Sequence, residues 1–504
     1  MRGASLRAYH DRTKHTPRSV RESGHFLDWR NEPSKFKRYV GLEIQPLPPW
    51  HPTGVPAVEA LGSSANTDGP AAVGVEALSH VLFHSAGISR TFRSDHGEFH
   101  FRTYACAGAL YPVEVYIVAG EVEGLEPGVY HYAPLEHGLI RLRQGDLRGN
   151  LGLAEASAGA ATLIFTGIPW RTAWKYTTRG FRHLYWDSGM MLANLLASAS
   201  ALRLRARVYL AFVDGAANDV VGVDGESEFA LCAVSIGGGR TPRPADLAPL
   251  EHEVVPLSPR PERDPHIDEA HQAMQLTSED EVHAFREAAL EEPHRRDQGM
   301  FPEETRLAGD TLGRDPIEEV IRLRGSTRQL AREPVPGSEI ASILDLSLSG
   351  VPGDWLRGDR SIHTVVMAAA VEGLPSGIHD YMPGGRFRLR REGTFRNEAG
   401  YLCLEQRLGA DSAAVTFLLA DLDRTLDRLG DRGYAAAQLE AAIVAGRIYL
   451  GAYAQCLGTS GITFYDDDIR RFLETELEPM LVMVTGPEGR RESIRRCRQD
   501  RRPS

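Results

Sequence analysis

The pattern of apolar positions contains one long stretch twice. The first copy runs from Arg179 to Asp214, and the second begins 253 residues later at Arg432 and follows without a gap to Asp467. In each copy an Arg-Gly-aromatic start leads into a Pro-free segment dense in Ala, Leu, Met and Ile. This composition predicts a long helix that is apolar around most of its circumference, as in helices buried between two subunits. We therefore expect a duplicated module whose two long helices pack together as an internal pseudo-dimer.

Shorter patterns around these helices predict strands. A β-branched and aromatic run follows each helix, at Val208–Val213 and at Ile462–Tyr465, and upstream of each helix a hairpin with the phrase VEGL occurs, at Val122 and again at Val371. Each half is thus predicted to be α+β, with one sheet around a central helix. The predicted division is an N-terminal arm (1–55), a first lobe (56–240), a linker (241–312), a second lobe (313–488) and a basic tail (489–504).

The connecting segments are polar and rich in Pro. The arm is basic and His-rich, which predicts extended chain with one short helix near Ser19–Trp29, and it is a candidate peptide-binding element. The linker contains a predicted helical stretch from Pro265 to Ala289. The segment Pro169–Thr178 is expected to be a connection that opens the first long helix.

Composition narrows the class of protein. The chain has 504 residues, enough for two or three domains, and its 42% hydrophobic and 25% charged residues are those of an ordinary soluble protein. A net charge of −11 argues against nucleic acid as the main partner. The five scattered cysteines show no paired spacing, which favours a reducing cytoplasm and predicts neither a disulfide framework nor a zinc site. The polar N-terminus is not expected to be a signal peptide, and no apolar run reaches the roughly 18 residues of a membrane span.

The two halves differ where chemistry is expected. The loop RTYACAGALYP, which starts at Arg102, has no counterpart in the second half, and Lys175-Tyr176 aligns with Arg428-Leu429. Conversely, the cluster Arg324–Arg328 (RGSTR) opens only the second half. Each half holds pieces that the other lacks, which predicts one composite active site across the pseudo-dimer interface.

These pieces have chemical uses, each with a plainer alternative. Two arginines flanking a serine near a helix start can grip a phosphate, although a solvated helix start also explains such a run. The small residues Cys106–Ala109 let backbone N–H groups approach a planar ligand, or simply form a tight turn. Lys175 and Tyr176 can act as general acid and base if burial and nearby arginines lower their pKa values, but such a pair is also common on surfaces.

Two further features are assigned structural roles. Cys106 has no partner His at a nucleophile's spacing, so a small buried side chain is favoured. The run Asp466–Asp468 precedes a helical pattern and is interpreted as a helix cap, so no metal site is expected.

Together these residues resemble a known family. The arm motif YHDRTKHTPRS, the phrase RTYACAGALYPVEVYIVAGEVEGLEPGVYHY, the element RTAWKYTTRGFRHLYWDSG and the second-half RGSTR resemble the SagB-type (azoline oxidase) dehydrogenases of the nitroreductase superfamily over nearly the whole chain. The resemblance implies a tandem nitroreductase-like fold that binds FMN and oxidises thiazolines or oxazolines in a ribosomally made peptide. It also implies a cytoplasmic protein whose partners are an azoline-containing precursor peptide and a cyclodehydratase complex.

The resemblance also implies roles for individual residues. Lys175 and Tyr176 would be catalytic. The cofactor-binding residues would be Arg324, Ser326 and Arg328 at the FMN phosphate and ribityl chain, Cys106, Ala107, Gly108 and Ala109 beside the isoalloxazine ring, and Gly461 at the flavin edge, with a further phosphate contact from Arg490 or Arg491.

One departure and several alternatives stay open. Ala105-Cys106 stands where relatives carry Pro-Ser, and a thiol is a poorer hydrogen-bond donor than a hydroxyl, which puts the redox tuning in doubt. The alternatives to azoline oxidation are an NAD(P)H-dependent nitro- or quinone reductase and a flavin-free peptide-binding scaffold. The substrate peptide, the electron acceptor, the number of flavins and the formation of a homodimer are left open.

Overall fold

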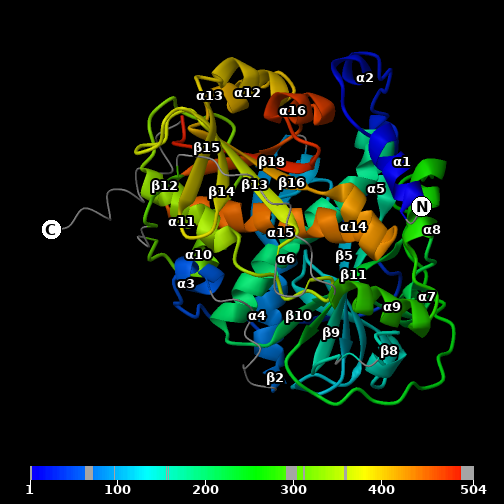
Figure 1. Cartoon of the computed structure of the whole chain (residues 1–504). Helices are drawn as coiled ribbons and strands as arrows, with labels where there is room; N and C mark the ends of the chain where they lie inside the picture. Colours follow the sequence, from blue (N-terminus) through cyan, green and yellow to red (C-terminus); the bar gives the residue numbers. More distant parts are fainter. Residues whose placement is uncertain are drawn as a thin grey trace.

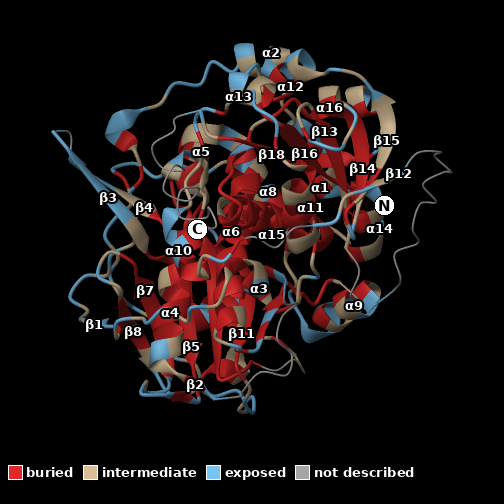
Figure 2. Cartoon of the chain, turned by 90° about the vertical axis from the view of Figure 1, so that its left-hand side faces the viewer, coloured by how far each residue is buried: buried red, intermediate tan, exposed pale blue. Residues whose placement is uncertain are grey.

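Two seven-stranded antiparallel sheets, one in each half of the chain, flank a pair of long central helices (Figure 1). The computed structural model describes residues 3–62, 72–95, 97–154, 156, 158–290, 304–309, 313–356 and 360–489. Figure 2 shows that burial is concentrated on the central helices and the sheet strands facing them. None of the described helices combines the length and apolar character that crossing a bilayer requires.

The two sheets share one strand order. The first runs β1 (Ile44–Pro46), β8 (Gly138–Gln144), β7 (Gly128–Ala133), β5 (Val113–Ala119), β9 (Ala161–Gly167), β11 (Phe229–Ile236) and β10 (Ala206–Tyr209). The second runs β12 (Glu304–Arg306), β15 (Arg386–Glu392), β14 (Gly377–Met382), β13 (Ile362–Ala368), β16 (Ala414–Ala420), β18 (Glu478–Gly486) and β17 (Gly458–Ile462). Two small sheets pair β2 (Val73–Gly74) with β6 (Val122–Glu123) and β3 (Ile88–Ser94) with β4 (Gly97–Arg102). The predicted duplicated α+β fold is therefore confirmed.

The helices cover the sheets and fill the centre. In the arm and first lobe they are α1 (Ala4–Arg12), α2 (Pro17–Arg21), α3 (Ala57–Gly62), α4 (Val75–Ala86), α5 (Pro169–Tyr176), α6 (Gly180–Ala201) and α7 (Asp214–Val221). In the remainder they are α8 (Pro265–Met274), α9 (Glu279–Leu290), α10 (Ile317–Leu323), α11 (Gly337–Ser347), α12 (Arg396–Leu402), α13 (Arg407–Asp411), α14 (Leu422–Leu429), α15 (Arg432–Ala454) and α16 (Asp466–Leu473). Short 3-10 turns stand at Trp29–Asn31, Ala107–Ala109, Arg148–Asn150 and Thr177–Arg179.

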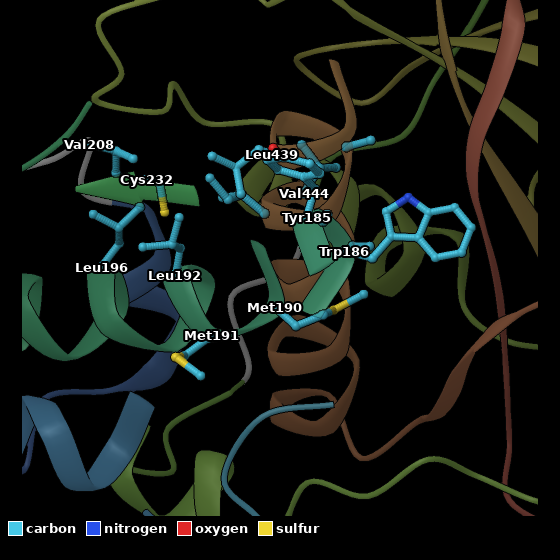
Figure 3. Packing of buried hydrophobic residues seen from close by; sticks show 14 of the residues in the cluster. Tyr185, Trp186, Met190, Met191, Leu192, Leu196, Val208, Cys232, Leu439 and Val444 are labelled. Atoms are coloured by element: carbon cyan, nitrogen blue, oxygen red, sulfur yellow. The ribbon is translucent and has the colours of Figure 1, made fainter. Parts of the chain in front are cut away.

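The long helices α6 and α15 meet through small residues at equivalent positions. A Cβ placed on Gly189 would lie 2.3 Å from the Cβ of Ala442, and one on Gly446 would lie 2.5 Å from the Cβ of Ala193. In both pairs the partners are 253 residues apart, so the pseudo-twofold axis passes between them. Large apolar side chains, such as Met190 of α6, complete the core on either side (Figure 3). This packing confirms the predicted helix pair.

The gapless repeat ends earlier than the sequence suggested. Arg432 forms an ion pair with Asp214 at the start of α7, at 2.9 Å, and Arg179 forms the equivalent pair with Asp466 at the start of α16, at 3.0 Å. Asp214 therefore corresponds to Asp466 and not to Asp467. The connection from β17 to α16 is one residue shorter than that from β10 to α7, which accounts for the shift.

The arm is more helical than predicted. The expected helix near Ser19–Trp29 is wrong for most of its length, because α1 lies before this stretch, α2 overlaps it only at Ser19–Arg21, and a 3-10 turn forms at its end. Tertiary contacts hold α1: at the second lobe, Lys14 and His10 contact Glu478 at 2.9 and 3.3 Å. At the first lobe, Arg182 donates to the carbonyl of His10 and to the hydroxyl of Thr13. The arm thus bridges the two lobes beside the N-termini of α6 and α15.

Candidate active site

The loop before β5 is held in an unusual backbone conformation. Gly108, Ala109 and Tyr111 have φ angles of 65°, 53° and 50°, in the left-handed region that favours glycine. A Cβ on Gly108 would lie 2.9 Å from the hydroxyl of Tyr176 and 3.1 Å from the Nζ of Lys175. The loop therefore faces the Lys-Tyr pair, and this approach needs a residue without a side chain.

Lys175 and Tyr176 stand at the end of a helix, not in the connection that the sequence suggested. Pro169 begins α5, where its fixed φ suits a first helical position, and Thr177 ends it with a φ of 50°. Neither polar end has a hydrogen bond or ion pair with a described residue, and the Nζ of Lys175 lies 5.5 Å from the ring centroid of Tyr176. Both groups are thus available to a ligand.

The Tyr176 ring rests on a buried histidine. It stacks on His183 with centroids 4.3 Å apart and planes 15° apart. Burial, followed by the nearby charge of Arg179, holds the pKa of His183 well below its usual value, and neither ring nitrogen has a partner among the described residues. His183 is therefore a neutral platform. Burial raises the pKa of Tyr176, so the condition of a lowered pKa is not met for this residue and its phenol stays protonated at neutral pH.

A buried carboxyl anchors the Gly108 loop. The thiol of Cys106 donates to Asp187 Oδ2 at 3.0 Å, the N–H of Ala107 donates to Oδ1 at 3.3 Å, and the N–H of Tyr111 donates to the Cys106 sulfur at 3.1 Å. Burial raises the pKa of Asp187 to about 7 and, with the charge of Asp187, raises that of Cys106 well above its usual value. A protonated thiol is a poor nucleophile, in line with a structural role for Cys106.

The second lobe reaches the same place through the residues after α10. Arg324 Nη2 donates at 3.1 Å to the carbonyl of Thr103, just before the Gly108 loop. The hydroxyl of Ser326 lies 3.1 Å from that of Tyr449 on α15, and the same Tyr449 oxygen accepts from the N–H of Gly461 at 2.7 Å. The structure thus joins Arg324 to the first lobe and gathers Ser326 and Gly461 around Tyr449.

The remaining predicted residues lie at the margin of this cluster. Arg328 is exposed, and within the described ranges it has no hydrogen bond or ion pair, although its charge acts to lower the pKa of Tyr176. Arg490 and Arg491 lie outside the described residues. The free donors of Arg328, the hydroxyl of Ser326, the bare backbone at Gly108 and the unpaired ends of Lys175 and Tyr176 suit a planar cofactor that carries a phosphate. Arg324 already donates hydrogen bonds to backbone carbonyls of the first lobe, so it is better suited to positioning that chain than to binding the cofactor.

Sequence reasoning missed three residues of this site, Asp187, His183 and Tyr449. Asp187 alone gave a usable signal, because an acid inside a mostly apolar, buried helix is costly unless it has a specific partner. The roles of His183 and Tyr449 depend on neighbours distant in sequence.

The pseudo-twofold axis relates this site to a second position, and there the segment Gly353–Trp355 of the second lobe takes up the space. Gly353 bridges Val208 along the outer edge of β10, the counterpart of β17. Asp354 accepts the N–H groups of Leu210 and Ala211 at 2.8 and 3.1 Å, and Trp355 beside it is 1% exposed. On β10 this segment occupies the edge that corresponds to the edge of β17, where Gly461 is exposed.

Comparison with known proteins assigns both halves of the chain to one family. The model of the nitroreductase family matches residues 76–238 and 321–486, more than half of the chain. A Methanocaldococcus jannaschii protein that carries a provisional nitroreductase name is 30% identical over 165 residues, which cover 32% of this chain and 78% of that protein.

Two further relatives differ in what they cover. The microcin B17-processing protein McbC of Escherichia coli is 30% identical over 123 residues, 22% of this chain and 45% of McbC, so the match spans less than half of McbC's length. A crystal structure from Anabaena variabilis, also provisionally named a nitroreductase, has a TM-score of 0.73 and 24% identity, and covers 96% of this chain and 99% of that one. At this identity the likeness shows the fold alone.

Proposed function

Because this chain belongs to the nitroreductase family, we propose that it is a SagB-type, FMN-dependent dehydrogenase that oxidises thiazoline or oxazoline rings in a peptide to thiazoles or oxazoles. The observation that carries the proposal is the approach of Gly108 to the unpaired ends of Lys175 and Tyr176. The likeness to McbC, whose name describes processing of microcin B17, supports a peptide substrate. A cyclodehydratase complex that makes the azoline is the proposed partner.

Both lobes would hold the cofactor. Arg328 and Ser326 offer charged and hydroxyl donors for the phosphate and ribityl chain, and Arg324 ties this cluster to the first lobe. Ala107, Gly108 and Ala109 offer a flat backbone surface for the ring, with Gly461 at its edge. Bound FMN would supply the acceptor for the hydride that leaves the azoline ring.

The Lys-Tyr pair would handle the proton. Oxidation removes two hydrogens from each ring, one as hydride and one as a proton that needs a base within about 3 Å. Because burial raises the pKa of Tyr176, its phenol is a hydrogen-bond donor that can orient the ring. Lys175 is the proposed acceptor of the proton. His183 fixes the direction of the Tyr176 ring by stacking.

Three measurements on the purified protein test this function. We expect a flavin absorption spectrum, bleaching of that spectrum without oxygen by an azoline-containing peptide, and a mass loss of two hydrogens per ring. Bleaching by NADPH but not by the azoline peptide would instead identify a nitro- or quinone-reductase activity. Failure of the protein to take up FMN would instead support the flavin-free peptide-binding scaffold.

A further inference from the structure

A groove runs along the first half of α5, outside the site described above. One cavity of about 440 Å³ is lined by Trp170 and Ala173 of α5, by the segment Val254–Leu257 and by the start of α8. A second of about 300 Å³ shares Asp224, among others, with the first and extends it along α7 and α8, on the side of the molecule where α1 and α5 also lie (Figure 1). We call these two cavities together the α5 groove.

The charge of the α5 groove is strongly one-sided. The first cavity is lined by six carboxylates and two cations. Both cations are already paired: Lys37 lies 2.6 Å from Glu228, and Arg263 contacts Glu226 and Asp268. Glu262 is exposed and has no ion pair with a described residue. The excess of negative charge therefore has no cationic partner in the described chain and fits a basic ligand.

One wall of the α5 groove offers a short extended stretch with an unpaired backbone edge at Val254, which forms an isolated antiparallel bridge with Tyr39 of the arm. The N–H of Val255 donates to Arg38, and the carbonyl of Glu253 accepts from Val40. Because successive residues of an extended chain direct their backbone groups to opposite edges, the N–H and C=O of Val254 point away from the arm. No described backbone group bonds them. An extended peptide can pair with such an edge while its side chains enter the groove.

The α5 groove is joined to the candidate active site. Asp264 in its wall accepts a hydrogen bond from the hydroxyl of Thr178 at 2.6 Å, two residues after Tyr176. The helix α5 also presents Trp170 to the groove at one end and Lys175 and Tyr176 to the Gly108 loop at the other. Eight helical residues span about 12 Å, or about four residues of extended peptide.

We propose that the α5 groove binds a basic and apolar segment of the substrate peptide in extended conformation, a few residues from the ring that is oxidised. This inference rests on the proposed function for the identity of the peptide. Apolar side chains of the segment pack on Trp170 and Ala173, basic side chains face the carboxylates, and the backbone pairs with Val254. The groove thereby sets which peptides are accepted and which of their rings reaches Lys175.

A binding measurement with the full chain tests the groove without requiring turnover. The probe is a fluorescent peptide with one thiazoline and a flank of alternating Lys and Leu, followed by fluorescence anisotropy. We expect Glu262→Lys to weaken binding about tenfold, because a charge that attracted the flank now repels it. Glu392→Lys, an exposed change at the end of β15 in the other lobe, should leave binding unchanged.

Two changes to the peptide separate charge from backbone pairing. A flank of alternating Glu and Leu should bind at least tenfold more weakly. The Lys and Leu flank with alternate backbone nitrogens methylated should also lose affinity, because it cannot pair with the edge at Val254. The proposal would be overturned if the acidic flank bound as tightly as the basic flank, or if Glu262→Lys bound the probe as tightly as wild type. Full binding of the methylated flank would overturn the backbone pairing.

The outcome is distinguishable from failure of the proposed function. A short thiazoline without a flank should be oxidised equally well by wild type and Glu262→Lys, since the groove does not touch it. Oxidation of this short substrate with no effect of flank charge on binding would overturn the groove alone. Charge-dependent binding without any ring oxidation would overturn the dehydrogenase and keep the groove as a peptide site.

Discussion

At the scale of single residues, two unpaired polar groups stand out at the end of α5. Lys175 and Tyr176 have no hydrogen bond with a described residue, yet the backbone of Gly108 approaches both. We expect Lys175→Ala and Tyr176→Phe to keep FMN uptake and to lose turnover by about 100-fold or more, the usual contribution of proton transfer. Steady-state oxidation of a thiazoline peptide measures this. Tyr401→Phe, which removes an exposed hydroxyl in the second lobe, serves as the control. Full activity in both variants would refute the assignment.

Asp187 predicts a dependence of stability on pH. Burial raises its pKa from 3.8 in the unfolded chain to about 7 in the fold. The folded protein therefore binds the extra proton between these values, and stability falls as pH rises through this window. The cost of ionising Asp187 is at most about 4 kcal/mol.

The variant Asp187→Asn cannot ionise, so we expect its free energy of unfolding relative to wild type to improve as pH rises from about 5 to about 8. Urea denaturation at both pH values measures the change. Asp219→Asn, at an exposed position on α7, should show no such trend. A constant difference across the range would show that Asp187 is ionised throughout.

The residues of the candidate site were partly visible in the sequence. Divergence between the halves pointed to the Gly108 loop, the Lys-Tyr pair and the Arg324–Arg328 cluster, and the structure brings the loop to the pair and Arg324 to Thr103. Their roles stay predictions. The raised pKa of Tyr176 could not be foreseen, because it depends on burial against a helix that the sequence places only approximately.

At the scale of elements, the contact between α6 and α15 depends on small side chains. We expect Gly189→Ala to destabilise the fold by about 1–3 kcal/mol, because the new methyl group would meet Ala442 at 2.3 Å in a packed core. Gly215→Ala in α7 meets nothing within 4 Å and should stabilise by about 0.5–1 kcal/mol. Urea unfolding of both variants provides the comparison, and a neutral Gly189→Ala would mean that the helices can separate without cost.

The elements that the sequence predicted well are those with a strong internal pattern. The long helices were evident because apolar residues cover nearly their whole surface. The first helix, α1, was missed because its sequence is polar and its conformation depends on contacts such as His10 with Glu478. Helix α5 was taken for a connection because Pro169 and the four β-branched or aromatic residues of the helix weaken its local pattern.

At the scale of the whole molecule, the two lobes are unequal. The first lobe's loop leaves Gly108 bare, whereas the equivalent chain of the second lobe, Gly353–Trp355, lies against β10 and is tied to it by Asp354. We therefore predict one FMN for each chain. Released flavin and protein concentration, measured on the same sample, give the ratio, and Gly108→Val should reduce it by crowding Lys175 and Tyr176. A ratio near two would contradict the blocked second position.

The bond from Arg324 to the carbonyl of Thr103 joins two halves of one polypeptide. If one variant is damaged at Lys175 and another at Arg328, a mixture of the two contains no molecule in which both parts are intact. Two such mutants should therefore fail to restore activity when they are coexpressed. Both parts of the site belong to the same polypeptide, so mixing chains cannot combine an intact first lobe with an intact second lobe. Genetic complementation would consequently require cutting the chain between the lobes.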